Sequence, residues 1–204
     1  MVANVDRLFM SPTEYIAWEE EQEFRHEYLD GEAYAMTGGS LNHNSIALNV
    51  ASALKTRLRG TGCRVFINDV KVQVSIKGPY FYPDVVVACN SDDFRLPPGD
   101  AKATLKLISH PRVIIEVLSP GTEGYDRGEK FKKYRQMSSL QEYILIDPRQ
   151  VAIECYRLNE RNKWELTAYN SDELTDATIV EFPSIDFECS IASIYEDVEF
   201  PTAS

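Results

Sequence analysis

The chain has 204 residues, of which 44% are hydrophobic and 26% are charged, so it has enough apolar material for a packed core and is neither disordered nor collagen-like. This length fits one domain, at roughly 150 residues per domain. The net charge of −11 at pH 7 argues at first sight against a general binder of polyanions.

The acidic residues concentrate toward the two ends of the sequence. Residues 14–32 contain eight acids and one base, and residues 172–200 contain nine acids and no base. The middle of the chain is therefore net basic. Clustered bases are typical of a surface that faces phosphate groups, although solvated helix faces can show the same pattern. The three clusters are Lys55, Arg57, Arg59 and Arg64; Lys102, Lys106 and Arg112; and Arg127, Lys130, Lys132, Lys133 and Arg135.

The sequence has no apolar stretch near 18 residues long and no signal-peptide pattern at its start. We therefore expect a soluble, cytoplasmic protein that does not contact a membrane. The four cysteines stand far apart without a CxxC spacing, which predicts reduced and mostly buried thiols, with no zinc site or disulfide framework.

The first third of the sequence predicts a helix, a hairpin and a second helix. Ser11 followed by Pro12 and Glu14 forms a capping-box pattern, which predicts a helix that runs to about Glu23. The Asp-Gly pair inside RHEYLDGEAYAM predicts a tight hairpin. Apolar residues then recur at helical spacing, which predicts a helix over residues 42–59 that ends at two glycines.

Strands dominate the rest of the sequence. Alternation from Val70 to Ile76 predicts a half-buried strand, and YFYPDVVVA predicts another, in which Pro83 suits an edge, a bulge or a strand start. Residues 90–111 read as a loop. The apolar runs RVIIEVLS and EYILID predict buried strands on either side of a helix that starts near Asp126. A hairpin over 151–157 and 163–169, a strand at 178–182 and a short helix at 190–195 complete the prediction.

This order of elements predicts one mixed α/β (α+β) domain over residues 1–204, with helices packed on a central sheet. An N-terminal helix and hairpin unit covers residues 11–37, and an acidic C-terminal tail covers residues 172–204.

Two carboxylates stand inside apolar strands. Asp84 precedes three valines, and Glu116 lies within VIIEVL. Burying an isolated carboxylate costs several kcal/mol, so such groups pair with a cation, ligate a metal or take up a proton. The pair can converge on one divalent cation, because Mg²⁺ typically takes one or two carboxylates beside a phosphate. The alternative is that one of them ends its strand in solvent or pairs with an arginine.

The helix after Glu116 supplies a cation. Phe131 and Tyr134 define its buried side, and a helical wheel then places Arg127 near the centre of that side and Lys130 at its border. Lys130 is also close to the loop that leads from Glu116, so its ammonium can reach a phosphate held there. The alternative is a lysine whose stem snorkels along the surface.

The strings YPDVVVA, IIEVLSPGT, YDRGEKFKKYR and EYILIDP, with the upstream HEYLDGEAYAMTGGSLNHNSIALNV, resemble the Uma two family of restriction endonuclease-like proteins, within the PD-(D/E)XK nuclease superfamily and abundant in cyanobacteria. The resemblance covers roughly residues 10–170. It implies a restriction-endonuclease-like mixed central sheet flanked by helices, with Asp84 as the PD aspartate and Glu116 as the acidic residue of the ExK half-motif.

One position departs from the superfamily pattern, because Leu118 stands where its lysine would fall. Either the amine has moved, with Lys130 as the best candidate, or catalysis is impaired. Glu27 matches a family glutamate and could complete the metal shell, although it lies in an acidic segment where solvated charges are common. His43 matches a family histidine, although a lone histidine is more often a capping or core group.

The sequence thus predicts a metal-dependent endonuclease that hydrolyses phosphodiester bonds of DNA. In this hypothesis Mg²⁺ or Mn²⁺ is held by Asp84, Glu116 and Glu27, and Lys130 orients the attacking water or stabilises charge on the phosphate oxygens. Arg127 and His43 are predicted to contact the substrate. Because paired cuts need two sites and most oligomers are twofold, a homodimer is one assembly that fits this function, although no residue of the sequence points to it.

Two alternatives stay open. Leu118 and the net charge of −11 favour a catalytically silent module that keeps the nuclease fold for nucleic-acid binding or assembly. The second alternative is a hydrolase that uses the two carboxylates as an acid and base pair, as glycosidases do. The only tryptophans, Trp18 and Trp164, lie far from either carboxylate in the sequence, which argues against it.

Overall fold

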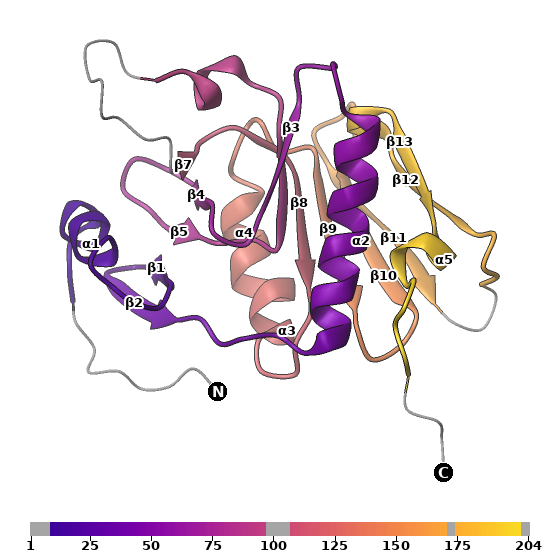
Figure 1. The fold of residues 1–204 in the computed structure, drawn as a ribbon. Helices are drawn as coiled ribbons and strands as arrows, with labels where there is room; N and C mark the ends of the chain where they lie inside the picture. The colour runs from indigo at the N-terminus through magenta and orange to yellow at the C-terminus, as the bar shows by residue number, and fades with distance from the viewer. Residues whose placement is uncertain (1–8, 97–106, 171–173, 201–204) are drawn as a thin grey trace.

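The computed structural model describes residues 9–96, 107–170 and 174–200. Its centre is a mixed sheet of six strands in the order β11-β10-β9-β8-β6-β3 (Figure 1). These strands are β3 (Arg64–Ile67), β6 (Val85–Ala88), β8 (Pro111–Val117), β9 (Glu142–Asp147), β10 (Ala152–Leu158) and β11 (Trp164–Asn170). Strands β8 and β9 run parallel, and the other neighbours run antiparallel.

A smaller sheet of five short strands lies beside the central sheet, in the order β2-β1-β5-β4-β7. Its strands are β1 (His26–Leu29), β2 (Glu32–Ala35), β4 (Lys71–Gln73), β5 (Tyr80–Phe81) and β7 (Leu107–Ile108). A two-stranded sheet near the C-terminus pairs β12 (Ile179–Phe182) with β13 (Phe187–Ser190).

Helices cover the central sheet on both faces. The long helix α2 (Leu41–Arg57) packs Ile46, Val50 and Leu54 against one face. The opposite face packs against a helical segment made of α3 (Glu123–Tyr125), a π-helical turn η2 (Asp126–Lys130) and α4 (Phe131–Tyr134). This segment connects the parallel strands β8 and β9, which need such a crossover. The remaining helical pieces are α1 (Pro12–Glu19), η1 (Ser91–Phe94), η3 (Pro183–Ile185) and α5 (Ile191–Ile194).

The mixed α/β class predicted from the sequence is confirmed. The capping box at Ser11 is present, and the hairpin turns at Asp30 and Gly31, both of which have positive φ, as a tight turn of this kind requires. The helix predicted over residues 42–59, the strands at RVIIEVLS and EYILID, and the later hairpin are all found.

Several predicted elements are wrong in extent. Helix α1 ends at Glu19. The segment YFYPDVVVA forms two strands in different sheets, with Pro83 and Asp84 between them, because the proline interrupts the ladder. The alternating run from Val70 to Ile76 pairs only over β4, and Ile76 is exposed.

Strands β3 and β13 were not predicted, and the segment 90–111 contains the short elements η1 and β7. Lys102 and Lys106 of the second basic cluster lie outside the described residues.

The prediction for the cysteines is half wrong. Cys155 and Cys189 are free and buried, but Cys63 and Cys89 form a disulfide. Strands β3 and β6 pair antiparallel with Arg64 opposite Ala88, which brings the residues just outside this pair together across 26 positions of sequence. The spacing of the cysteines in the sequence does not predict this contact.

Across the described ranges, no helix is both long and apolar enough to span a bilayer.

Candidate active site

Asp84 and Glu116 meet at one end of the central sheet. Strands β6 and β8 pair with Val85 opposite Ile115, so the next step of this register places Asp84 opposite Glu116. Residues that face each other in an antiparallel pair share one face of the sheet, here the face that packs against α4. The convergence predicted from the sequence therefore follows from the pairing of these two strands.

Glu116 is 4% exposed and its carboxylate is bound by the helical segment. Lys130 Nζ lies 3.1 Å from Glu116 Oε1, and the Tyr134 hydroxyl lies 3.5 Å from the same oxygen. Burial raises the pKa of Glu116 well above its ordinary value, and the nearby carboxylates of Asp126 and Asp84 add to this, while Lys130 opposes it.

Lys130 is the centre of a buried ion cluster. Its ammonium lies 2.9 Å from Glu27 Oε1 and 3.3 Å from Asp126 Oδ1, in addition to Glu116. Burial alone would lower the pKa of Lys130, but the charges of Glu116, Glu27 and Asp126 outweigh it and raise this pKa. The amine therefore keeps its proton. We call Glu27, Asp84, Glu116 and Asp126, with Lys130, the acidic cluster.

The N-terminal hairpin brings Glu27 into this cluster. Glu27 Oε1 accepts a hydrogen bond from the backbone N–H of Tyr82 at 3.1 Å, and burial raises the pKa of Glu27. At the hairpin turn, Lys133 of α4 lies 3.1 Å from Asp30. The hairpin is thus tied to the helical segment both at its turn and through the Glu27–Lys130 pair.

Asp84 has a different set of partners. Asp84 Oδ2 accepts the backbone N–H of Val117 at 2.7 Å and lies 3.3 Å from His43 Nε2. Burial would lower the pKa of His43, but the hydrogen bond to Asp84 and the charge of this carboxylate raise it above its ordinary value. His43, at the start of α2, therefore orients Asp84, and neither residue is bonded to Lys130.

Two residues of the cluster were misjudged from the sequence. The sequence predicted a helix that starts near Asp126, whereas the helical segment starts at Glu123 and Asp126 is buried against Lys130. The wheel also placed Arg127 deeper than Lys130, whereas Lys130 is buried and the Arg127 side chain is 35% exposed. The cause is the π-helical turn over residues 126–130, where the 100° step of an α-helix does not hold.

Asp126 and Tyr134 were missed as members of the site. Asp126 is four residues before Lys130, a spacing that places the two on one helical face and could have pointed to the pair. Tyr134 was assigned only to the core, and nothing in its sequence position marks its hydroxyl as a partner of Glu116.

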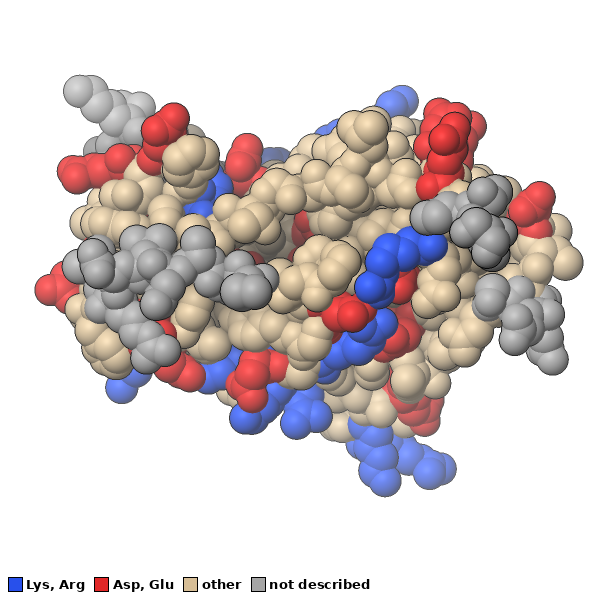
Figure 2. All heavy atoms as spheres, turned by 90° about the horizontal axis from the view of Figure 1, so that it is seen from below, with Lys and Arg blue, Asp and Glu red and all other residues tan. Residues whose placement is uncertain are grey.

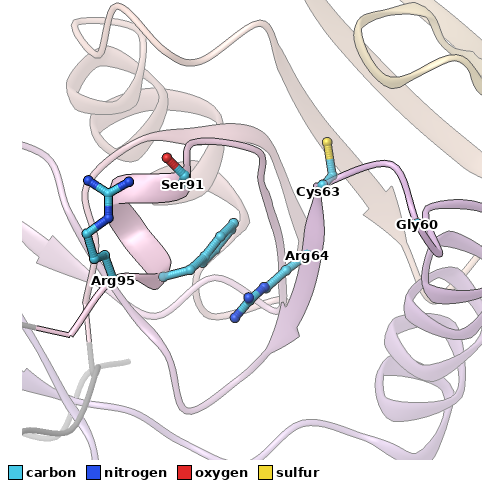
Figure 3. A pocket seen from close by; sticks show the side chains of 7 residues that line it. Gly60, Cys63, Arg64, Ser91 and Arg95 are labelled. Carbon is cyan, nitrogen blue, oxygen red and sulfur yellow. The ribbon is translucent and has the colours of Figure 1, made fainter.

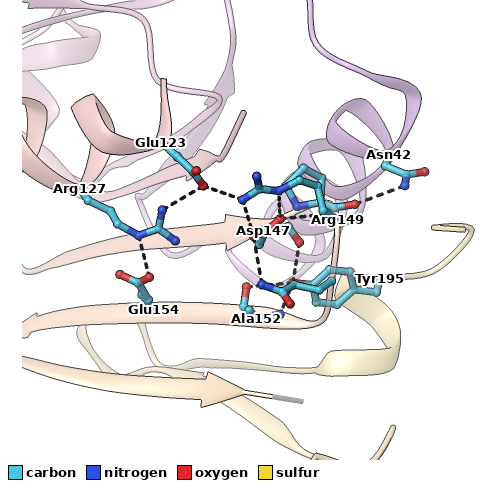
Figure 4. A network of polar contacts seen from close by, with 10 residues as sticks. Asn42, Glu123, Arg127, Asp147, Arg149, Ala152, Glu154 and Tyr195 are labelled. Atoms are coloured by element: carbon cyan, nitrogen blue, oxygen red, sulfur yellow. Dashed lines mark hydrogen bonds and ion pairs between the residues drawn. The ribbon is translucent and has the colours of Figure 1, made fainter. Parts of the chain in front are cut away.

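Arg127 belongs to a neighbouring network. Its guanidinium binds Glu154 at 2.9 Å and Glu123 at 3.2 Å (Figure 4). Glu123 also pairs with Arg149, which binds Asp147 at the end of β9. The network fastens the helical segment that carries Lys130 to strands β9 and β10.

The face of the molecule that is seen from below carries both acidic and basic side chains (Figure 2). Seen from below, one face has a hollow near its middle with acidic atoms inside it, and beside the hollow basic and acidic side chains alternate (Figure 2).

The side chains of the acidic cluster meet only part of what a hard cation such as Mg²⁺ requires of its ligands. Among the residues that the structure describes, no three His, Cys, Asp or Glu side chains are grouped so that they could hold a metal ion, and Lys130 lies where Glu27, Glu116 and Asp126 converge. Mg²⁺ needs only one or two carboxylates, because water and substrate supply its other ligands. Asp84, just before β6, and Glu116, on β8, meet this requirement.

The sequence matches a family model and known relatives. A family model named Uma2 and described as "Putative restriction endonuclease" matches residues 12–191. The chain belongs to the Uma2 family. The relatives include two Synechocystis proteins described as uncharacterized. One, slr1290, is 37% identical over 191 residues, which are 94% of each chain. The other, sll1609, is 30% identical over 158 residues, which are 78% of this chain and 86% of its own.

A solved structure from Anabaena variabilis, titled as a putative nuclease belonging to DUF820, superposes with a TM-score of 0.72. It is 18% identical, and the match covers 91% of this chain and 97% of that one. The two chains share one fold.

Proposed function

We propose that this Uma2 protein is a metal-dependent endonuclease that hydrolyses phosphodiester bonds of DNA at the acidic cluster. The observation that carries the proposal is that Asp84, just before β6, accepts a hydrogen bond from the N–H of Val117, the neighbour of Glu116 on β8. The Lys130 ammonium lies 3.1 Å from Glu116. Two carboxylates and an amine are the groups that a PD-(D/E)XK site requires. The family match and the shared fold support the same reading.

The position of the amine explains the departure at Leu118. The Leu118 side chain is 1% exposed and belongs to the apolar core beside α4. The amine comes instead from Lys130, 14 residues after Glu116. The chain thus has a lysine ammonium at the carboxylate without a lysine in the motif.

The residues of the cluster have separate roles in this mechanism. Asp84 and Glu116 would hold Mg²⁺ or Mn²⁺, which supplies a polarised phosphate and a bound water of lowered pKa. Lys130 stays protonated because of its three carboxylate neighbours, so it stabilises negative charge on the phosphate oxygens and does not act as a base. His43 fixes Asp84 in place, and Glu27 and Asp126 fix Lys130.

The test is a plasmid-nicking assay with Mg²⁺ or Mn²⁺. Glu116→Gln should abolish nicking. Glu142→Gln is the matched control, because Glu142 is also a buried carboxylate in the central sheet but accepts from the Ser184 N–H, away from the cluster. Retention of nicking in Glu116→Gln would rule out the proposed site.

A second candidate is a catalytically silent module that binds nucleic acid. The Lys130 ammonium favours it, because this cation already lies among three of the carboxylates. A wild-type protein that binds DNA but does not nick plasmid with either metal would identify this function.

A further inference from the structure

The end of the central sheet opposite the acidic cluster carries a pocket of different chemistry (Figure 3). Its volume is about 510 Å³, and we call it the basic pocket. Strand β6 (Val85–Ala88) lies between Asp84 at the acidic cluster and Cys89 at the pocket. These five steps of extended chain span about 17 Å, at roughly 3.3 Å per residue. The pocket is lined by Gly60, Gly62, Cys63, Arg64, Ser91, Phe94 and Arg95.

No acid lines this pocket, and its two arginines enter from different elements. Arg64 begins strand β3, and Arg95 follows η1. Within the described ranges no carboxylate pairs with Arg64. Arg95 pairs with Asp92 at 3.3 Å, but both side chains are largely exposed, and such surface pairs contribute little. Both guanidinium groups are therefore available to an anion.

Arg64 is held in a defined orientation. Its guanidinium lies over the Phe94 ring, 4.3 Å from the ring centre, and Phe94 contacts Phe66. A guanidinium stacked on an aromatic ring keeps its N–H groups directed outward along its edge, which suits two-pronged contact with phosphate. The Cys63–Cys89 disulfide ties the two strands at this place.

The pocket wall leaves room for a ligand. Gly60 and Gly62 have positive φ, and a Cβ added at either would have no atom within 4 Å. Lys55 in the last turn of α2 and Arg59 just after the helix precede Gly60 in the sequence, and no carboxylate pairs with either in the part of the chain that the structure describes. Of the first basic cluster of the sequence, Arg64 lines the pocket, while Arg57 pairs with Asp186.

Arg64 also faces the same way as the acidic cluster. It pairs with Ala88, and residues 84, 86 and 88 of one strand share a face. A nucleic-acid strand that advances about 3.4 Å per nucleotide would cover the distance between the two ends of β6 in about five steps.

We propose that the basic pocket binds a backbone phosphate of the nucleic acid whose cleavage is proposed at the acidic cluster. The inference rests on that proposed function for the identity of the ligand. It assigns Arg64 and Arg95 to phosphate contact and gives them no part in the chemistry.

The experiment measures the salt dependence of DNA binding. A fluorescent 20-base-pair duplex is titrated with the full chain in EDTA, which prevents cleavage, at several salt concentrations. Arg64→Ala with Arg95→Ala should weaken binding and reduce the slope of log K against log salt by about one to two, since each lost phosphate contact removes about one. The matched control is Arg161→Ala with Lys163→Ala, which removes two exposed charges from the β10–β11 turn.

A second variant keeps both positive charges and removes only the guanidinium geometry. Arg64→Lys with Arg95→Lys should keep most of the slope while losing affinity, because lysine cannot make the two-pronged contact. Thermal melting of each variant reports whether its fold is intact.

The outcomes separate the two proposals. A double alanine variant that matches its control in affinity and slope, while wild type nicks plasmid, overturns the pocket and leaves the nuclease. Calorimetric binding of inorganic phosphate that is lost in the variant, with DNA binding unchanged, also overturns the inference, since the pocket would then serve a small anion. A wild type that binds no DNA overturns both.

Discussion

Strand β6 begins at the acidic cluster and ends at the basic pocket, and different interactions hold these two ends. At the acidic end one buried ammonium is shared by three carboxylates at 2.9 to 3.3 Å. At the basic end a disulfide joins the strands, and the charged groups are exposed. The charged groups are therefore buried and paired at the acidic end, and exposed at the basic end.

This difference matters because a buried charge and an exposed charge respond to substitution in opposite ways. Removing one partner of a buried ion pair leaves its neighbours uncompensated, which destabilises the fold. Removing an exposed charge changes stability little and changes ligand attraction more.

The largest expected effect is at Lys130. Lys130→Met leaves Glu27, Glu116 and Asp126 without their cation, and we expect a loss of about 3 to 5 kcal/mol in the free energy of unfolding, measured by urea denaturation at pH 7. Lys132→Met is the matched control, because this side chain is 58% exposed and pairs with the exposed Glu129. Equal stability of the two variants would mean that the buried ion cluster does not form.

The disulfide should come next. Cys63→Ser with Cys89→Ser opens a link across 26 positions, and we expect a loss of about 3 kcal/mol in the same denaturation experiment. Cys155→Ala is not a suitable control because Cys155 is part of the core, so wild type with and without a reductant provides the comparison. A reductant that leaves the unfolding midpoint unchanged would show that the two thiols are not bonded.

Sequence reasoning succeeded where structure depends on neighbours along the chain. The capping box at Ser11 and the turn at Asp30-Gly31 are set by a few adjacent residues, and both are present. The carboxylates Asp84 and Glu116 were also found from local pattern, because a charge beside or inside an apolar run is visible without knowing the partner strand. Only Glu116 lies within a strand, and Asp84 precedes β6.

The sequence was insufficient where the outcome depends on strand pairing or on helix type. Cys63 and Cys89 meet only because β3 pairs with β6. The burial of the Lys130 side chain depends on a π-helical turn, and no residue pattern in the sequence predicts such a turn.

His43 should show a pH effect that is specific to the acidic end. Its pKa is raised by Asp84 against the effect of burial, so its contribution to stability is complete below the unfolded pKa of about 6.5 and is lost as the pH rises through the folded pKa. NMR titration should place the folded pKa above the ordinary value in wild type and lower it in Asp84→Asn. A His43 pKa that does not change in this variant would contradict the pairing.

The smallest effect should be at Arg127, which the sequence assigned to the substrate and the structure places against Glu154 and Glu123. Arg127→Ala should cost about 1 kcal/mol of stability, a value kept small by partial exposure, and should leave the salt slope of DNA binding unchanged. A salt slope reduced by about one would instead show that Arg127 contacts the nucleic acid, as the sequence predicted.

The most direct test of the central claim is calorimetric titration of Mg²⁺ and of Mn²⁺ into wild type and into Asp84→Ala with Glu116→Ala. We predict saturable binding of at least one of these metals to wild type and none to the double variant. Because Lys130 keeps two carboxylate partners in this variant, unfolding is checked by its melting curve. Absence of binding to wild type, or equal binding to a folded double variant, would contradict the assignment of Asp84 and Glu116 as the metal ligands.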